Sequence, residues 1–340
     1  MLRKVHVEKA VGMVLCHDMT KIIPGKFKGV AFRKGHVIQE ADIPNLLKMG
    51  KEYIYAWETR EGLIHENDAA LRLARAVSGS GLEITEPEEG KVSIIARYGG
   101  LLKVNAEYLD KINCLDGLAV ATLHNNRVVK KGDMIAGARV IPLVIEESKI
   151  EEIENICAET GGLMEVKPLH KPKVGLVITG NEVYYGRIED KFGPVLRKKM
   201  QQYQCKIKCE IIVPDHERRI AAALRELIQQ GVELILISGG MSVDPDDVTP
   251  AGVRTAGGEI VVYGTPVLPG SMFMLAYLQE IPVLGLPGCV MYNRTTVFDL
   301  ILPRVLAGEK LSRPDLAFLG CGGLCSNCPT CTFPHCPFGK

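Results

Sequence analysis

Strand-like and helix-like patterns alternate between residues 173 and 308, and this alternation restricts the possible folds more than any other feature. Apolar runs typical of buried strands occupy residues 173–179, 206–213, 232–237 and 281–286. Helical patterns follow them at residues 193–204, 216–230, 249–258 and 289–308. Strands separated by helices of this length form a parallel sheet covered on both faces. We predict a doubly wound, mostly parallel α/β domain that binds ligands beyond the carboxyl ends of its strands.

The loop after the third strand combines glycines, hydroxyl residues and aspartates in the segment SGGMSVDPDDVTPA, residues 238–251. Glycines after a buried strand let backbone N–H groups approach an anionic oxygen, and a following helix adds the positive end of its dipole. Gly239 and Gly240 fit such a phosphate cradle, with Ser242 as a hydroxyl donor. Taken alone, a plain strand-to-helix connection is the commoner interpretation of the two glycines.

The aspartates of this loop favour a cation beside the anion. A carboxylate near a phosphate repels it unless both bind a divalent cation. Simpler interpretations exist, since Asp247 could cap the helix that begins near Thr249, and Asp244 before Pro245 is a common turn pair. A cap needs one such residue, however, and the loop has three.

Other connections at the same predicted edge carry similar groups. The first-strand loop supplies Thr179, Gly180, Asn181, Glu182 and Asp190, the second supplies Asp215, and the last carries the turn Pro287–Gly288. For Asp215 an ordinary helix cap is by itself the favoured interpretation. Because these strand ends converge, the sequence predicts an anion site with a cation.

These motifs resemble the molybdopterin-binding fold shared by molybdenum cofactor biosynthesis proteins. The resemblance covers about residues 173–308 and rests on the ordered segments ITGNEVYYGRIEDKFGPVL, VPDHERRI, SGGMSVDPDDVTPA and LPGCVMYNRTTV. SGGMSV is closer to the molybdopterin molybdenumtransferases. DDVTPA and VPDHERRI are closer to the adenylyltransferases and the competence/damage-inducible type.

The resemblance implies roles for individual residues. Those implied to bind the pterin cofactor and its phosphate are Thr179, Gly180, Glu182, Gly239, Gly240, Ser242, Pro287 and Gly288. Asp215 and Asp247 match acidic positions tied to magnesium and catalysis. Asp246 is expected to help, and Asp244 to serve only the turn.

The resemblance implies a magnesium-dependent transferase similar to molybdopterin molybdenumtransferase, which would insert molybdate into adenylylated molybdopterin and release AMP. In two places the chain departs from the family, since Phe192 replaces an asparagine amide, and Cys289 and Val290 replace Asn-Pro. These departures favour a rival hypothesis, a non-catalytic molybdopterin or molybdenum-cofactor carrier or sensor that serves a molybdoenzyme partner. A third, weaker hypothesis is the ATP-dependent adenylyltransferase step. The resemblance also suggests a homodimer.

The segments before and after this domain look different, so we predict three parts: residues 1–172, 173–311 and 312–340. Residues 1–172 hold short, turn-punctuated runs of β-forming residues, with helical pieces at 42–50, 67–79 and 148–162. These patterns predict a β-rich or mixed α+β accessory region, for which a barrel is one of the architectures considered. The proline-containing segment 166–174 is the expected linker.

The last part is a cysteine-rich tail. Five of the chain's 11 cysteines are Cys321, Cys325, Cys328, Cys331 and Cys336. Thiolates two residues apart can hold one metal through a tight turn, and four thiolates suit zinc or an iron–sulfur cluster. We therefore predict a metal-binding tail, ordered by the metal or by docking onto the main body. A disordered thiol-rich tail is the alternative.

Charge and hydropathy exclude some partners. Lysine and arginine number 41 against 40 aspartates and glutamates, a net charge of +1. This balance predicts no general affinity for nucleic acid or for an anionic membrane. The longest apolar runs fall short of the roughly 20 residues that a membrane span needs. We expect a cytoplasmic protein.

Overall fold

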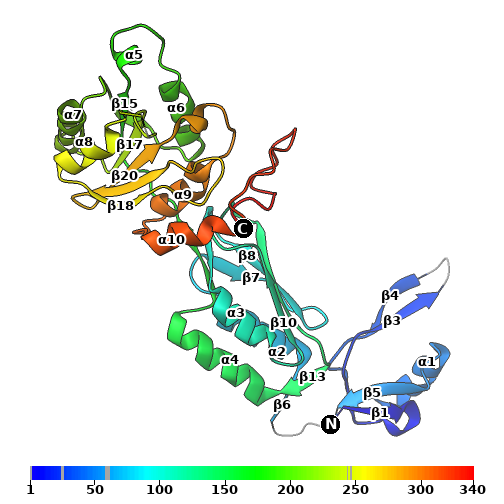
Figure 1. Ribbon diagram of the computed structural model, residues 1–340. Coiled ribbons are helices and arrows are strands. Elements are labelled where there is room, and N and C mark those ends of the chain that lie inside the picture. The colour runs from blue at the N-terminus through cyan, green and yellow to red at the C-terminus, as the bar shows by residue number, and fades with distance from the viewer. Residues whose placement is uncertain (1, 24–26, 58–61, 243, 246) are drawn as a thin grey trace. The chain divides into compact units, whose positions relative to one another are not determined.

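Figure 1 shows the computed structural model, which describes residues 2–23, 27–57, 62–242, 244–245 and 247–340. The chain divides into two units, one formed by Met1–Asn125 with Val129–Val166, the other by Asn126–Val128 with Lys167–Lys340. This division falls at the start of the segment predicted as the linker. The cysteine-rich tail groups with the second unit, and the three-part division stays a prediction.

Residues up to Pro168 form small sheets with helices. In chain order the elements are β1 (Leu2–His6), η1 (Val7–Lys9), β2 (Val14–Leu15), β3 (Met19–Ile23), β4 (Phe27–Phe32), η2 (Glu40–Asp42), α1 (Ile43–Lys48), β5 (Tyr53–Trp57), β6 (Leu63–His65), α2 (Glu66–Val77), β7 (Leu82–Ile84), β8 (Lys91–Ala96), β9 (Gly100–Val104), α3 (Ala106–Asn113), β10 (Leu118–Thr122), β11 (Arg127–Val129), β12 (Met134–Val140), β13 (Val144–Glu146), α4 (Glu147–Thr160) and β14 (Met164–Pro168). The strands pair in the orders β1-β5-β2, β3-β4, β13-β6, β10-β12-β8-β7 and β11-β9-β14. These small sheets agree with the predicted mixed α+β structure. Within the described residues they do not form the barrel that was also considered.

Helix α2 shows why this region folds as it does. Its buried residues Ala69, Leu73 and Val77 recur at helical spacing and share a core with Val92 and Ile94 of β8. The predicted helical pieces correspond to α1, α2 and α4. Helix α3 was not predicted, because it is only eight residues long and directly follows a run of β-forming residues.

The second unit is built on a six-stranded mixed sheet ordered β16-β15-β17-β20-β19-β18. Its elements are β15 (Val174–Thr179), α5 (Asn181–Tyr184), α6 (Phe192–Gln202), β16 (Ile207–Val213), α7 (Glu217–Gln229), β17 (Leu234–Ser238), α8 (Thr249–Ala256), β18 (Glu259–Tyr263), β19 (Met274–Leu278), β20 (Ile281–Leu286), η3 (Gly288–Met291), α9 (Val297–Leu306), α10 (Arg313–Ala317) and η4 (Phe318–Gly320). β16, β15, β17 and β20 run parallel, β19 pairs antiparallel with β20, and β18 pairs antiparallel with β19.

Helices cover both faces of this sheet. Along β15, Leu176 and Ile178 belong to a core shared with α6 and α9, whereas Val177 belongs to a second core shared with α7 and α8. Successive strand residues point to opposite faces, so an apolar strand such as β15 must be buried on both. The predicted doubly wound sheet is observed, with β19 and β18 added at one edge through antiparallel pairing.

Two features of this unit differ from the sequence prediction. Strands β18 and β19 were not predicted, and β19 turns into β20 through Gln279 and Glu280, both at positive φ. The predicted helix 289–308 begins only at Val297, because Thr296 and Asp299 form a capping box there.

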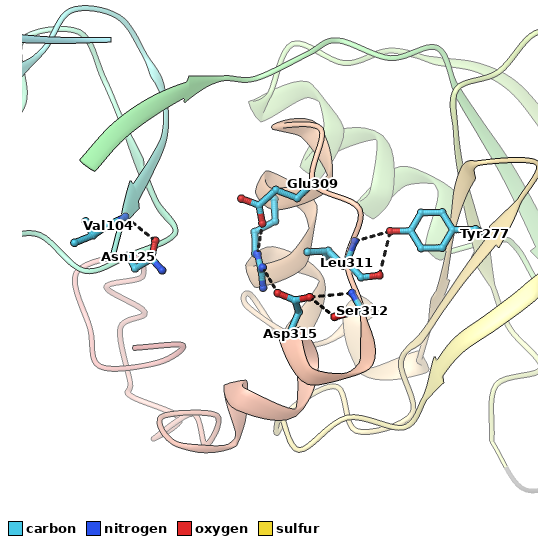
Figure 2. Close-up of polar contacts among 8 residues, drawn as sticks. Val104, Asn125, Tyr277, Glu309, Leu311, Ser312 and Asp315 are labelled. Atoms are coloured by element: carbon cyan, nitrogen blue, oxygen red, sulfur yellow. Dashed lines mark hydrogen bonds and ion pairs between the residues drawn. The ribbon is translucent and has the colours of Figure 1, made fainter. Parts of the chain in front are cut away.

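The segment after α9 is held by a buried cation (Figure 2). Arg304, 7% exposed, donates to Glu309 at 2.8 Å and to Asp315 at 2.7 Å. Asp315 also accepts the Ser312 N–H at 2.9 Å and so caps α10. Beside it, the Leu311 N–H donates to Tyr277 Oη at 2.7 Å. These contacts fix the path of the chain toward the tail.

No helix among the described residues is both long enough and apolar enough to cross a bilayer.

Candidate functional site

A cavity of ≈ 1030 Å³ lies where the parallel strands β15, β16 and β17 end. Residues predicted from sequence line it from three loops: Thr179, Gly180, Glu182, Asp215, Gly239, Gly240 and Asp247. The connection after β20 adds Met291 and Tyr292. The predicted edge of the sheet therefore does bring these groups together.

The Gly239–Gly240 turn leaves no room for side chains. Gly239 has φ +90° and Gly240 has φ +56°. A Cβ at Gly239 would lie 2.2 Å from the Thr179 carbonyl oxygen, and one at Gly240 would lie 2.6 Å from Thr249 Oγ1. The Thr249 hydroxyl also donates to the Gly239 carbonyl at 2.9 Å. Both positions therefore require glycine, and the backbone stays open to a ligand on the cavity side.

Asp215 is held by Asn181 in a reciprocal pair. Asp215 Oδ2 accepts the Asn181 N–H at 2.8 Å, and Asn181 Oδ1 accepts the Asp215 N–H at 3.3 Å. Helix α7 begins at Glu217 after His216 as its N-cap. The helix-cap interpretation of Asp215 is therefore wrong. Asp215 instead lines the cavity.

The Asp215 carboxyl is in an unfavourable place for a charge. Burial is the main cause that raises its pKa above the ordinary value, and the charges of Glu182 and Asp247 raise it further. Hydrogen bonds from Asn181 and Thr179 act in the opposite direction and do not cancel the rise. A cation bound here would relieve the repulsion among the three carboxylates.

Asp247 fixes its own loop rather than a helix. Its Oδ2 accepts the Asp244 N–H at 3.1 Å, and its N–H donates to the Asp244 carbonyl at 2.9 Å. Helix α8 begins at Thr249 with Val248 as its N-cap. The helix-cap interpretation of Asp247 is thus wrong, and Asp244 takes part in the turn, as its sequence context predicted. Asp246 lies outside the described residues.

The two predicted metal ligands suit magnesium. Within the described part of the chain, no three His, Cys, Asp or Glu side chains lie close enough to hold a metal ion by themselves. Magnesium does not require such a cage, because it keeps several waters and is commonly bound by one or two carboxylates plus substrate phosphates. Asp215 and Asp247 line the same cavity, and the charge of Asp247 contributes to the raised pKa of Asp215, so the two carboxylates fit that pattern.

Three residues predicted to bind the cofactor are not among those that line the cavity. Ser242 is exposed, and its carbonyl accepts from Tyr263 Oη at 2.9 Å. Pro287 is buried and Gly288 exposed at the start of η3. Tyr292, a few residues further on and 82% exposed, lines the cavity in their place.

The departure at Phe192 lies in the cavity wall. Phe192 starts α6, and its N–H donates to Asp190 Oδ1 at 2.8 Å. Asp190 also accepts the Gly193 N–H at 2.9 Å, so it caps α6. An aromatic ring thus stands where the resembling family has an amide. Cys289 is half-buried, outside the lining.

The predicted tail ligands divide into two groups. Cys325, Cys328, Cys331 and Cys336 line a smaller cavity of ≈ 160 Å³. Cys321 is exposed and is not part of that lining.

Met291 and Tyr292 were missed as site residues by sequence reasoning. Asn181 was named among the groups of the first loop but was given no role. Met291 and Tyr292 fell inside a segment predicted as helix, which hid an exposed connection at the sheet edge.

Two family matches were found. Residues 175–307 match a family described as "Probable molybdopterin binding domain", and residues 4–58 match a family described as a domain of unknown function. The first match spans the sheet, its helices and the large cavity.

Among curated proteins, a molybdopterin molybdenumtransferase from Synechococcus elongatus is 26% identical over 176 residues, which cover 49% of this chain and 44% of that protein. A CinA-like protein from Mycobacterium tuberculosis is 37% identical over 91 residues, covering 26% of this chain and 21% of that protein. The chain thus spans less than half the length of these curated relatives.

Among solved structures, the molybdopterin biosynthesis enzyme MoaB from Thermus thermophilus is similar at a TM-score of 0.34 and 20% identity, covering 41% of this chain and 98% of that one. By the family match, residues 175–307 are similar to a probable molybdopterin-binding domain.

Proposed function

We propose that the protein acts like a molybdopterin molybdenumtransferase, binding adenylylated molybdopterin, accepting molybdate and releasing AMP. One observation carries the proposal: the Asp215 and Asp247 carboxylates line the same cavity as the glycine turn at Gly239. A phosphate cradle that holds two carboxylates suits a ligand whose phosphates arrive with a cation. The family match supports the ligand, and the Synechococcus relative's name supports the reaction.

The chain's own groups would bind and orient that ligand. Backbone N–H groups of the Gly239–Gly240 turn would donate to a phosphate, since no Cβ blocks its approach. The rings of Phe192 and Tyr292 offer flat apolar surface to a pterin. The Asn181 N–H keeps the Asp215 carboxylate in place.

Magnesium, held by Asp215 and Asp247 when bound, would neutralise charge on the pyrophosphate and orient it. The raised pKa of Asp215 supports this assignment, because a cation favours the ionised form that burial disfavours. We further propose that the protein works in the cytoplasm as a homodimer.

A non-catalytic carrier or sensor is the second candidate, and Phe192 favours it. This ring lines the cavity without the hydrogen-bonding groups of the family's asparagine. Binding through stacking would remain, and positioning for the transfer step would be lost. Such a protein would hand the cofactor to a molybdoenzyme.

Incubation with adenylylated molybdopterin, molybdate and magnesium separates the two candidates. The transferase releases AMP, and Asp247→Asn abolishes release while the protein stays folded. The amide keeps an oxygen that can accept the Asp244 N–H but loses the charge that binds magnesium. AMP is measured by chromatography, and folding by circular dichroism.

Asp110→Asn, an exposed aspartate of α3, is the matched control and should release AMP like the wild type. Binding of the pterin without AMP release by the wild type would reject the transferase and support the carrier.

A further inference from the structure

The cysteine-rich tail is docked onto the second unit by ordinary protein contacts. The Leu268 N–H donates to Gly323 O at 2.8 Å, and the Cys325 N–H donates to Leu268 O at 2.8 Å. Phe338, near the end of the chain, is 4% exposed and belongs to the core shared with α6 and α9. The tail therefore follows a defined path, which determines where its cysteines lie.

Four of the five tail cysteines line a single cavity. Cys325, Cys328, Cys331 and Cys336 line it, and Cys321 does not. The rest of the wall includes Arg294 and Thr295 from the connection before α9. Thr295 Oγ1 lies 3.5 Å from Cys331 Sγ, within hydrogen-bond range for sulfur. The four thiols thus share one enclosure with a cationic and a hydroxyl side chain.

A single ion requires its ligands closer together than a cluster does. Tetrahedral zinc with Zn–S bonds of about 2.3 Å needs its sulfurs roughly 3.8 Å apart. In the described part of the chain, no three Cys, His, Asp or Glu side chains are gathered tightly enough for one ion. An iron–sulfur cluster tolerates wider spacing, because its thiolates are distributed over more than one iron atom.

The spacing of the four cysteines along the chain also fits an iron–sulfur cluster. Cys325, Cys328, Cys331 and Cys336 read C-x2-C-x2-C-x4-C and are followed by Pro337. Bacterial ferredoxins use a similar run, although there the fourth cysteine serves a second cluster. Here the fourth cysteine lines the same cavity as the other three.

We propose that Cys325, Cys328, Cys331 and Cys336 bind an iron–sulfur cluster, with Cys321 outside the site. The four thiols give up their protons and each binds iron as a thiolate. Arg294 offsets the negative charge of the thiolates, and the Thr295 hydroxyl donates to Cys331. Tyr292 lines both this cavity and the larger one, so the cluster lies beside the molybdopterin cavity.

The test is metal and sulfide analysis of the full chain purified without oxygen. We expect iron and acid-labile sulfide in equal amounts, about two or four of each per chain, with the visible absorption of a cluster. Cys→Ser at position 325, 328, 331 or 336 should lower the iron content several-fold. Cys321→Ser, the matched control, should leave it unchanged.

Circular dichroism and thermal unfolding show whether each serine variant is folded, and the wild-type analysis does not depend on the variants. About one zinc per chain without sulfide would overturn the proposal. Absence of metal from the wild type, or loss of iron in Cys321→Ser, would overturn it equally.

Discussion

At the scale of single residues, the sequence identified the acidic and glycine positions of the large cavity but not the bonds that hold them. Asp247 could be selected because its loop holds three aspartates, more than one helix cap uses, and Asp215 because it matches an acidic position of the resembling family. Their partners, the N–H groups of Asn181 and Asp244, could not be foreseen, because backbone donors have no sequence signature. Tyr292 was missed since its loop resembled a helix.

Replacing Gly239 with alanine tests the glycine turn. The new Cβ would meet the Thr179 carbonyl at 2.2 Å at a φ of +90°. We expect the unfolding free energy to fall by about 2 kcal/mol or more and molybdopterin binding to be lost. Urea unfolding and a pterin-binding titration measure the two effects.

Gly137→Ala in β12 is the matched control, because nothing lies within 4 Å of its added Cβ. The stability of this variant should stay near that of the wild type. An equal loss of stability in Gly137→Ala and Gly239→Ala would contradict a specific role for the Gly239 turn.

Replacing Asp215 with asparagine should stabilise the protein in the absence of divalent cations. The raised pKa of this carboxyl means that its charge destabilises the folded state at neutral pH, and the amide removes that charge. We expect a higher free energy of unfolding in urea at pH 7 with chelator. A loss of stability would show that the carboxylate is structurally required.

At the scale of elements, buried parallel strands were predictable and the edge hairpin was not. β15 and β17 are buried along their whole length, so they read as continuous apolar runs. The turn between β19 and β20 uses Gln279 and Glu280 at positive φ, residues without the usual Gly or Asn signal. The sequence prediction placed the start of α9 too early, because Thr296 caps the helix in the middle of the predicted range 289–308.

The Arg304–Asp315 pair predicts an acid-sensitive anchor between α9 and α10. Burial alone would raise the pKa of Asp315, but hydrogen bonds from Ser312 and Arg304 outweigh it and hold the pKa at about 2. A carboxyl whose folded pKa lies below the unfolded value of 3.8 stabilises the fold above that value. This contribution should disappear as the pH falls from about 4 to about 2.

Asp315→Asn should therefore lower the unfolding free energy at pH 7 by about 1–3 kcal/mol. Relative to the wild type it should also lose the part of the acid dependence that Asp315 causes. The free energy of unfolding, measured at several pH values, checks both expectations. The same pH dependence in the two proteins would contradict the role assigned to Asp315.

At the scale of the whole molecule, a region similar to a probable molybdopterin-binding domain shares the chain with parts of a different sequence character. Family matches cover residues 4–58 and 175–307, and the tail that follows the second match contributes the thiol cavity. The spacing of the tail cysteines predicted a metal site. It could not separate Cys321 from the other four, because that depends on how the tail docks against Leu268 and the α9 core.

The most direct test of the account is the affinity of the protein for adenylylated molybdopterin, measured by titration with magnesium and with chelator. The wild type should bind tightly with magnesium and about tenfold or more weakly without it, a difference of about 1.4 kcal/mol or more. Asp247→Asn should bind equally weakly in both conditions. Wild-type affinity that does not respond to magnesium, or absence of binding, would contradict the assignment of the cavity.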